Sequence, residues 1–147
     1  MTPERRRFVD DIAALYVPWA MPQISGRILG YLLLCPDPVS LDDIAADLEL
    51  SKSSASITTR LLEKHGLAIR HSVPGSKRVL YAASTNVGGL LLEKAALLGA
   101  TGRMLQSRCP DVADGKVEER FQKMAKIYLA MRDVIANAVH QLDTSEN

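Results

Sequence analysis

Residues 40–67 read SLDDIAADLELSKSSASITTRLLEKHGL, and this stretch decides the fold. Ser40 is a good cap for a short helix whose apolar residues recur at helical spacing as far as Leu48. A tight turn follows. Ser51 then caps another helix that ends at Gly66, where a left-handed C-cap favours glycine. Helices joined by so short a turn predict a helix-turn-helix.

The spacing of the apolar residues changes directly after this helix pair. In residues 67–73 the apolar side chains alternate as they do in a half-buried strand, and residues 79–82 form another such run. The Pro-Gly-Ser sequence at 74–76 between them is a turn signal, so we expect a β-hairpin with Lys77 and Arg78 near its tip. The order predicts a winged helix-turn-helix, a mainly α fold with a small β-hairpin wing.

Further helices are predicted on both sides of this lobe. One should run from residue 3 to about residue 17, where prolines follow, and the next from residue 25 to 35. A later helix should begin after residues 84–86 and end at Pro110, because proline interrupts helical hydrogen bonding. The last should run from about residue 116 to 142.

The last predicted helix carries a heptad seam. Its apolar residues are separated alternately by four and three positions, which is the spacing of a coiled-coil contact. The alternative is an amphipathic helix that packs on its own domain. However, the preceding lobe can close its own core, so the seam favours a second copy of the chain. The candidate dimerisation residues are Val117, Phe121, Met124, Tyr128, Met131, Ile135, Ala138 and Leu142.

These patterns divide the chain into three segments. We expect an N-terminal dimerisation helix in residues 1–22, the winged helix-turn-helix lobe in residues 23–83, and C-terminal dimerisation helices in residues 84–147. The length and the ordinary apolar content, 47%, suit one small domain with an appended arm.

The charge of the chain is concentrated rather than large. The net charge is +1, yet residues 51–81 hold six basic residues and one acid. This segment therefore carries +5 and leaves −4 for the rest of the chain. A basic patch on a nearly neutral protein is the expected footprint of a nucleic-acid contact, with a merely solvated face as the alternative.

The second helix of the pair has the faces that a contact with DNA requires. Its inward stripe should be Ala55, Thr58, Thr59 and Leu62. On the other side, Arg60 is suited to guanine and Ile57 to a thymine methyl group, although Arg60 could instead pair locally with Glu63. The candidate DNA-binding residues, including phosphate contacts, are Lys52, Ser53, Ser56, Ile57, Arg60, Arg70, Lys77 and Arg78.

These segments resemble MarR-type regulators, most closely the GbsR-like branch. The resemblance is carried by PQISGRILGYLLL at residues 22–34, by residues 40–67, and by VPGSKRVLYA at residues 73–82. It implies a homodimer in which the first and the last two helices interlock. It also implies binding of double-stranded DNA at a pseudo-palindromic operator, as a repressor or an activator, often with release by a small ligand.

Other classes of function find little support in the sequence. No Gly-rich phosphate loop or nucleophile–base pair is recognisable, so we expect neither an enzyme nor a cofactor. The cysteines and histidines lack metal-site spacing. No signal peptide is visible, and the apolar run at residues 31–35 is too short to span a bilayer, so we expect a cytoplasmic protein without a membrane partner. A winged helix that binds only another protein remains an alternative.

Two smaller hypotheses concern regulation. The candidate effector pocket is an aromatic group at the junction of the first two helices, with a choline-like cation as one ligand and a plain hydrophobic seal as the alternative. Its residues are Tyr16, Trp19, Met21 and Tyr31. A redox switch is the other hypothesis, since Cys109 follows a cation, Arg108, whereas Cys35 should be an inert core residue.

Overall fold

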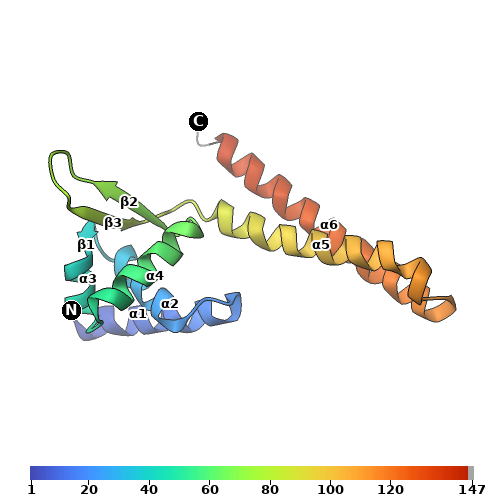
Figure 1. Cartoon of the computed structure of the whole chain (residues 1–147), viewed down its shortest axis with the longest axis horizontal. Coiled ribbons are helices and arrows are strands. Elements are labelled where there is room, and N and C mark those ends of the chain that lie inside the picture. Colours follow the sequence, from blue (N-terminus) through green and yellow to red (C-terminus); the bar gives the residue numbers. More distant parts are fainter. Residues whose placement is uncertain (146–147) are drawn as a thin grey trace. The chain divides into compact units, whose positions relative to one another are not determined.

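The computed structural model describes residues 1–145 and divides the chain into two compact units (Figure 1). The N-terminal unit is Met1–Val87 and the C-terminal unit is Gly88–Asn147. The first helix belongs to the N-terminal unit, where it packs on the next helix. The division falls after Val87, a few residues later than the predicted boundary at residue 83.

The helices of the N-terminal unit begin where the sequence offers caps. The Thr2 side chain accepts from the Arg5 amide, and Pro3 occupies the first turn, where its missing N–H costs nothing. Ser40 and Ser51 cap the two helices of the helix-turn-helix in the same way. The helices are α1 (Pro3–Tyr16), the 3₁₀ helix η1 (Val17–Trp19), α2 (Gln23–Leu33), α3 (Leu41–Asp47) and α4 (Lys52–Lys64).

The predicted hairpin is part of a three-stranded antiparallel sheet in the order β1-β3-β2. Strand β2 (Ala68–Ser72) pairs with β3 (Val79–Ala83), and Arg70 lies opposite Tyr81. The short strand β1 (Val39–Ser40) pairs with the other edge of β3. Sequence reasoning missed β1 because two residues are too few to show an alternating pattern.

Helices α1 and α2 pack closely because two glycines of α2 face α1. A Cβ atom at Gly26 would lie 2.5 Å from the Cα atom of Ala13, and one at Gly30 would lie 3.1 Å from the Cα atom of Val9. The two helices therefore run antiparallel, with backbone against backbone. The core beneath them is a set of fully buried apolar side chains, which are Val9, Ile28, Leu32, Ile44, Leu48, Leu62 and Leu67.

The C-terminal unit is a helical hairpin of α5 (Gly88–Val112) and α6 (Gly115–Ser145). Small residues again let the helices approach, since Gly99 and Ala95 of α5 are buried and so is Ala125 of α6. The hairpin agrees with the predicted pair of C-terminal helices.

The prediction that α5 ends at Pro110 is wrong, because the helix continues to Val112. Proline at this position removes only its own N–H, which would bond to the carbonyl of Gln106. The next turn is still closed, since the Ala113 amide donates to the Cys109 carbonyl at 2.9 Å. A proline in the last turn of a helix therefore does not mark its end.

Candidate nucleic-acid interface

The inward face of α4 fastens this helix to the N-terminal unit. Ala55, Thr59 and Leu62 are fully buried, as the stripe predicted from the sequence requires, whereas Thr58 is half-buried. The Thr59 hydroxyl is satisfied within the helix, because it donates to the Ala55 carbonyl at 2.8 Å. The packing of this face fixes which side chains α4 presents to the outside.

The outward face of α4 is polar with one apolar exception. Lys52, Ser53 and Arg60 are exposed, and Ser56 is half-buried between them. Ile57 lies on the same side and is 68% exposed. Because this side chain lies outside the core, it is accessible for an apolar contact with another molecule.

Arg60 is held by the residue one turn before it. Its Nη2 donates to the Ser56 Oγ at 3.0 Å, and no ion pair with Glu63 is found within residues 1–145. One carboxylate oxygen of Glu63 is buried. In place of the alternative pair with Glu63, Arg60 thus forms a hydrogen bond with Ser56 that aligns its guanidinium along the outward face.

Lys52 has an acidic neighbour that the sequence analysis did not single out. Its Nζ lies 3.0 Å from the Asp42 Oδ1 at the start of α3, and the two side chains are 69% and 74% exposed. The residues are ten positions apart and on different helices, so only the geometry of the helix-turn-helix reveals the pair.

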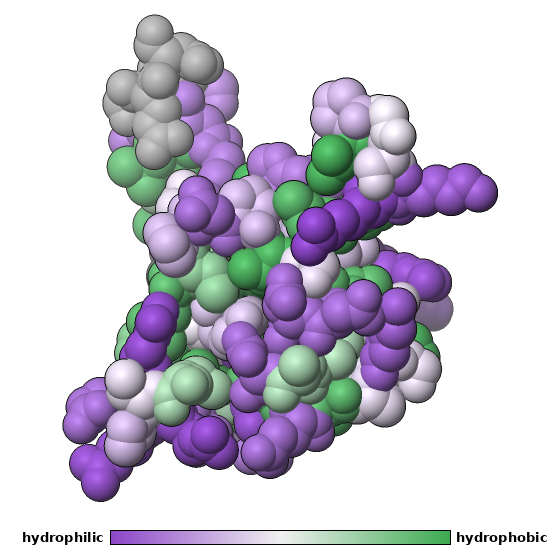
Figure 2. Space-filling view, turned by 90° about the vertical axis from the view of Figure 1, so that its left-hand side faces the viewer, coloured by the Kyte–Doolittle hydropathy of each residue, from purple (hydrophilic) through white to green (hydrophobic). Residues whose placement is uncertain are grey.

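The wing presents its cations on an open hairpin. Lys77 and Arg78 are exposed in the turn, where Gly75 adopts a φ of +74° that favours glycine. The Ser76 Oγ accepts from the Arg78 amide at 3.0 Å and stiffens the turn. Arg70 is exposed on β2. Figure 2 shows hydrophilic side chains over much of the face of the molecule that it presents.

One expectation for the wing differs from the structure. Ile69 was expected on a half-buried face, yet its side chain is 45% exposed, and Arg70, His71 and Ser72 are exposed beside it. In β2 only Ala68 is buried. A strand at the edge of a small sheet, with no helix over its outer part, leaves both of its faces to water.

The four residues of the predicted effector pocket do not come together. Because Ala13 packs on Gly26 and Val9 on Gly30, Tyr31 lies toward the beginning of α1. Tyr16 and Trp19 are at the other end of that helix, and Met21 is buried near them at the start of α2. The predicted grouping is therefore corrected. Aromatic residues that flank one helix pair in sequence were mistaken for neighbours in space.

The two cysteines have different surroundings. Cys35 is half-buried, its Sγ donates to the Tyr31 carbonyl at 3.3 Å, and burial raises the pKa of its thiol. Cys109 is only 7% exposed on α5. Redox sensors need an accessible thiolate, so neither site offers the surroundings that the redox hypothesis requires.

The heptad seam of α6 lies beside the contact between α5 and α6 and is partly covered. The side chains that meet α5 are displaced from the seam by one position, as Ala125 and Leu129 show next to Met124 and Tyr128. Met131 of the seam is 46% exposed. The exposed seam residues are Val117, Met124, Met131, Ala138 and Leu142, and the half-buried ones are Phe121, Tyr128 and Ile135.

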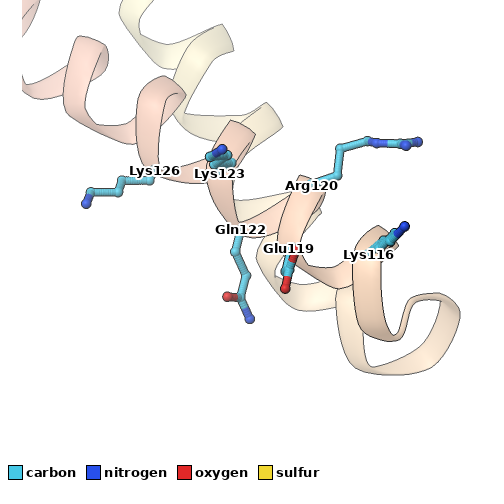
Figure 3. Close-up of a pocket in the computed structure, with 6 residues that line it drawn as sticks. All are labelled: Lys116, Glu119, Arg120, Gln122, Lys123 and Lys126. Atoms are coloured by element: carbon cyan, nitrogen blue, oxygen red, sulfur yellow. The ribbon is translucent and has the colours of Figure 1, made fainter.

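A basic groove lies along the first half of α6. Lys116, Arg120, Lys123 and Lys126 border an open volume of about 550 Å³ together with Glu119 and Gln122. Figure 3 shows that these side chains come from a single helix and point in different directions. Divergent exposed side chains do not converge on a ligand, so the groove is a solvated face.

Two further observations concern other partners. Within residues 1–145 no group of three or more histidine, cysteine or acidic side chains is arranged to hold a metal ion. In the same part of the chain, none of the helices combines the length and the apolar character that a membrane span needs.

Comparison with known proteins supports the fold. Residues 23–71 match the family model described as the IclR helix-turn-helix domain. The HTH-type transcriptional regulator MmpR5 of Mycobacterium tuberculosis is 28% identical over 85 residues, which cover 57% of this chain and 52% of that protein. The chain thus spans about half the length of this curated relative.

Solved structures extend the likeness to the whole chain. The crystal structure of a transcriptional regulator matches with a TM-score of 0.77 and 21% identity, over 97% of this chain and 99% of that chain. A MarR-family regulator from Rhodococcus matches at 22% identity over 86% of each chain, with a TM-score of only 0.45. The predicted winged helix-turn-helix fold is confirmed, and the chain is a homologue of a transcriptional regulator. The GbsR-like branch stays a prediction.

Proposed function

We propose that this protein is a sequence-specific DNA-binding transcriptional regulator that acts as a homodimer. The observation that carries the proposal is the outward face of α4, where Ser53, Ser56, Ile57 and Arg60 stand clear of the core. Helix α4 lies in the major groove, which admits one α-helix. Arg60 pairs with guanine and Ile57 contacts a thymine methyl group, which are contacts that distinguish base pairs.

The cations around α4 supply affinity rather than specificity. Lys77 and Arg78 contact phosphates or the minor groove from the wing, and Arg70 adds a contact from β2. Lys52, at the start of α4, reaches a phosphate when its ion pair with Asp42 opens. Such contacts release counterions and so make binding dependent on salt.

The exposed seam of α6 supports the assembly. A charge-poor apolar stripe on a long helix is stable in water only when it is covered, and an identical seam on a second chain fits it. A twofold dimer presents two α4 helices to successive major grooves on one side of DNA, about 34 Å apart. The operator is then a pseudo-palindrome, where the bound dimer acts as a repressor that a small ligand releases.

The test is selection of bound fragments from a genomic DNA library with the purified full chain, followed by titration of the selected site at several salt concentrations. With about four phosphates neutralised by each subunit, log K should fall against log[salt] with a slope of roughly −7. The double variant Lys77→Ala/Arg78→Ala should weaken all sequences alike and flatten this slope. Selection of no common sequence would contradict the proposal and favour a winged helix that binds only another protein.

A further inference from the structure

A cavity of about 220 Å³ opens within the N-terminal unit between the beginning of α1, the end of α2 and the end of α3. Arg5 of α1, Tyr31 and Leu34 of α2, Cys35, and Asp47 of α3 border it. It is smaller than most drug-binding pockets, which suits a ligand of few atoms. None of the residues proposed to contact DNA lines this cavity.

The polar groups of this cavity come from three different helices. The Tyr31 hydroxyl donates to the Asp47 Oδ2 at 2.6 Å, and the tyrosine side chain is only 8% exposed. Arg5 donates through its Nη2 to the Leu34 carbonyl at the end of α2. A buried aromatic ring thus forms part of the wall, while a guanidinium and a carboxylate, both on exposed residues, stand at its edge.

These charges select the chemistry of a ligand. A simple anion would be attracted by Arg5 but repelled by Asp47. A simple cation would be attracted by Asp47 but repelled by Arg5. A molecule that carries both charges satisfies both groups. The Asp47 carboxylate forms charge-assisted hydrogen bonds with N–H donors, which a primary ammonium group has and a quaternary ammonium group lacks.

We propose that this cavity binds a small zwitterion, with its carboxylate on Arg5 and its primary ammonium group on Asp47. The inference rests on the proposed function only for its consequence, which is control of DNA binding. The Cys35 thiol takes no covalent part, because burial keeps it protonated.

The site is placed to alter the helix-turn-helix. Asp47 is the last residue of α3, and its hydrogen bond with Tyr31 ties α3 to α2. A ligand ammonium group competes with the Tyr31 hydroxyl for the same carboxylate. The ligand therefore has a different affinity for the tied and the untied arrangement, which is what an allosteric effect requires.

The test uses the full-length protein and a series of ω-amino acids, from glycine through 4-aminobutyrate to 6-aminohexanoate, added without DNA. Binding is followed by the amide NMR shifts of Tyr31, Cys35 and Asp47. One chain length should bind best. The same-length amine, the same-length carboxylate and glycine betaine should each bind about tenfold more weakly, which corresponds to about 1.4 kcal/mol.

Variants separate the roles of the two charges. Asp47→Asn and Arg5→Gln should each abolish the preference for the zwitterion, whereas Tyr31→Phe should tighten binding because it removes the competing hydroxyl. Arg7→Gln, an exposed arginine of α1 that does not border the cavity, is the matched control and should leave binding unchanged. Thermal melting establishes that each variant is folded.

The outcomes distinguish this inference from the proposed function. If no ω-amino acid shifts these amides at millimolar concentration, or if the folded Asp47→Asn and Arg5→Gln variants bind as the unaltered protein does, the zwitterion site is wrong even when DNA binds. Binding of the zwitterion by a protein that selects no DNA would support the site and refute only the regulator. When both bind, the zwitterion should change operator affinity.

Discussion

Helix α4 of the N-terminal unit and helix α6 of the C-terminal unit expose different kinds of side chain. In the N-terminal unit large apolar side chains such as Ile28, Ile44 and Leu62 form a core, and the outward face of α4 exposes serine, lysine and arginine. In the C-terminal unit α6 buries alanine and valine against α5 and leaves Met131, 46% exposed, and Val134, 59% exposed, in water. The outward face of α4 contains a single exposed large apolar side chain, Ile57, whereas α6 exposes a run of them, which favours a partner surface.

The difference assigns separate tasks to the two units. A polar outward face on a helix with a well-packed inner face is suited to DNA, which is polar and charged. An apolar outward face is suited to another protein surface, and to a like surface when the seam is regular.

A charge in the seam of α6 should break the dimer. In Met131→Glu the carboxylate would be buried without a partner in the assembled protein but would stay in water in the monomer, since Met131 is exposed in the single chain. We expect dimerisation to weaken by about 3 kcal/mol or more, which is at least about a hundredfold. Analytical ultracentrifugation measures the change.

The control for this variant is Asn137→Glu, which adds the same charge to an exposed position of α6 outside the seam. It should sediment as the unaltered protein does. A full-length chain that is already monomeric at micromolar concentration would contradict the dimer. Loss of operator affinity in Met131→Glu, with α4 unaltered, would show that the two units depend on each other for function.

The glycines of the two units should respond differently to a methyl group. In Gly26→Ala the new Cβ would meet the backbone of Ala13 at 2.5 Å, which only a shift of α1 can relieve. We expect a loss of about 2 to 3 kcal/mol in the free energy of unfolding. In Gly99→Ala the new Cβ meets the flexible side chain of Arg132, which can move aside.

Gly99→Ala should therefore change stability little, because the gain in helix propensity of up to about 1 kcal/mol offsets the displacement of Arg132. Gly89→Ala, with open space around its new Cβ, is the control for propensity alone. Urea unfolding followed by circular dichroism gives all three values. Equal destabilisation by Gly26→Ala and Gly99→Ala would mean that both helix pairs are packed with the same rigidity.

Local signals in the sequence were sufficient for the elements of the fold. Serine caps, the glycine at residue 66 and the change of period gave the helix-turn-helix and the hairpin, because these features act over a few residues. The strand β1 was missed because its pairing with β3 is long-range and only two residues long. The end of α5 was misplaced because a proline in a last turn costs one hydrogen bond only.

The site was less predictable than the fold, because several of its contacts join residues that are far apart in the sequence. The outward side chains of α4 follow from helical spacing, and Arg60 and Ile57 are both exposed. The ion pair of Lys52 with Asp42 joins two different helices, so the local spacing of residues in the sequence does not reveal it. The effector grouping failed likewise, since the antiparallel packing of α2 on α1 places Tyr31 at the opposite end of α1 from Tyr16 and Trp19.

Arg60→Ala should relax sequence preference at one base pair of each half-site and cost about 1 to 3 kcal/mol there. Ser56→Ala should have a smaller effect, about 1 kcal/mol at the same base pair, because Arg60 keeps its charge but loses the hydroxyl that aligns it. Competition assays with single-base variants of the selected operator measure both. Lys77→Ala is the control and should weaken all of these sequences alike.

An unchanged base preference in Arg60→Ala would remove this residue from sequence reading. If Ser56→Ala instead weakens every sequence equally, its hydroxyl contacts phosphate rather than positioning Arg60. Either result would leave the polar face of α4 intact as a DNA surface and change only how it reads the bases.

The smallest effect is expected at Asp42, the acid that pairs with Lys52 of α4. Its ion pair with Lys52 is exposed on both sides, so Asp42→Asn should change the free energy of unfolding by no more than about 1 kcal/mol. DNA binding should nevertheless respond. Release of Lys52 allows one more phosphate contact per subunit, which steepens the salt slope of the dimer by about 2.

Asp43→Asn is the matched control, because it removes the same charge at the next residue, where the carboxylate accepts from Ser40 and does not contact Lys52. Its salt slope should stay close to that of the unaltered protein. Equal steepening by both variants would show that only the local net charge matters and that Lys52 is already on the phosphate when DNA is bound. A steeper slope in Asp42→Asn alone would identify Asp42 as a residue that restrains non-specific binding at the polar face of α4.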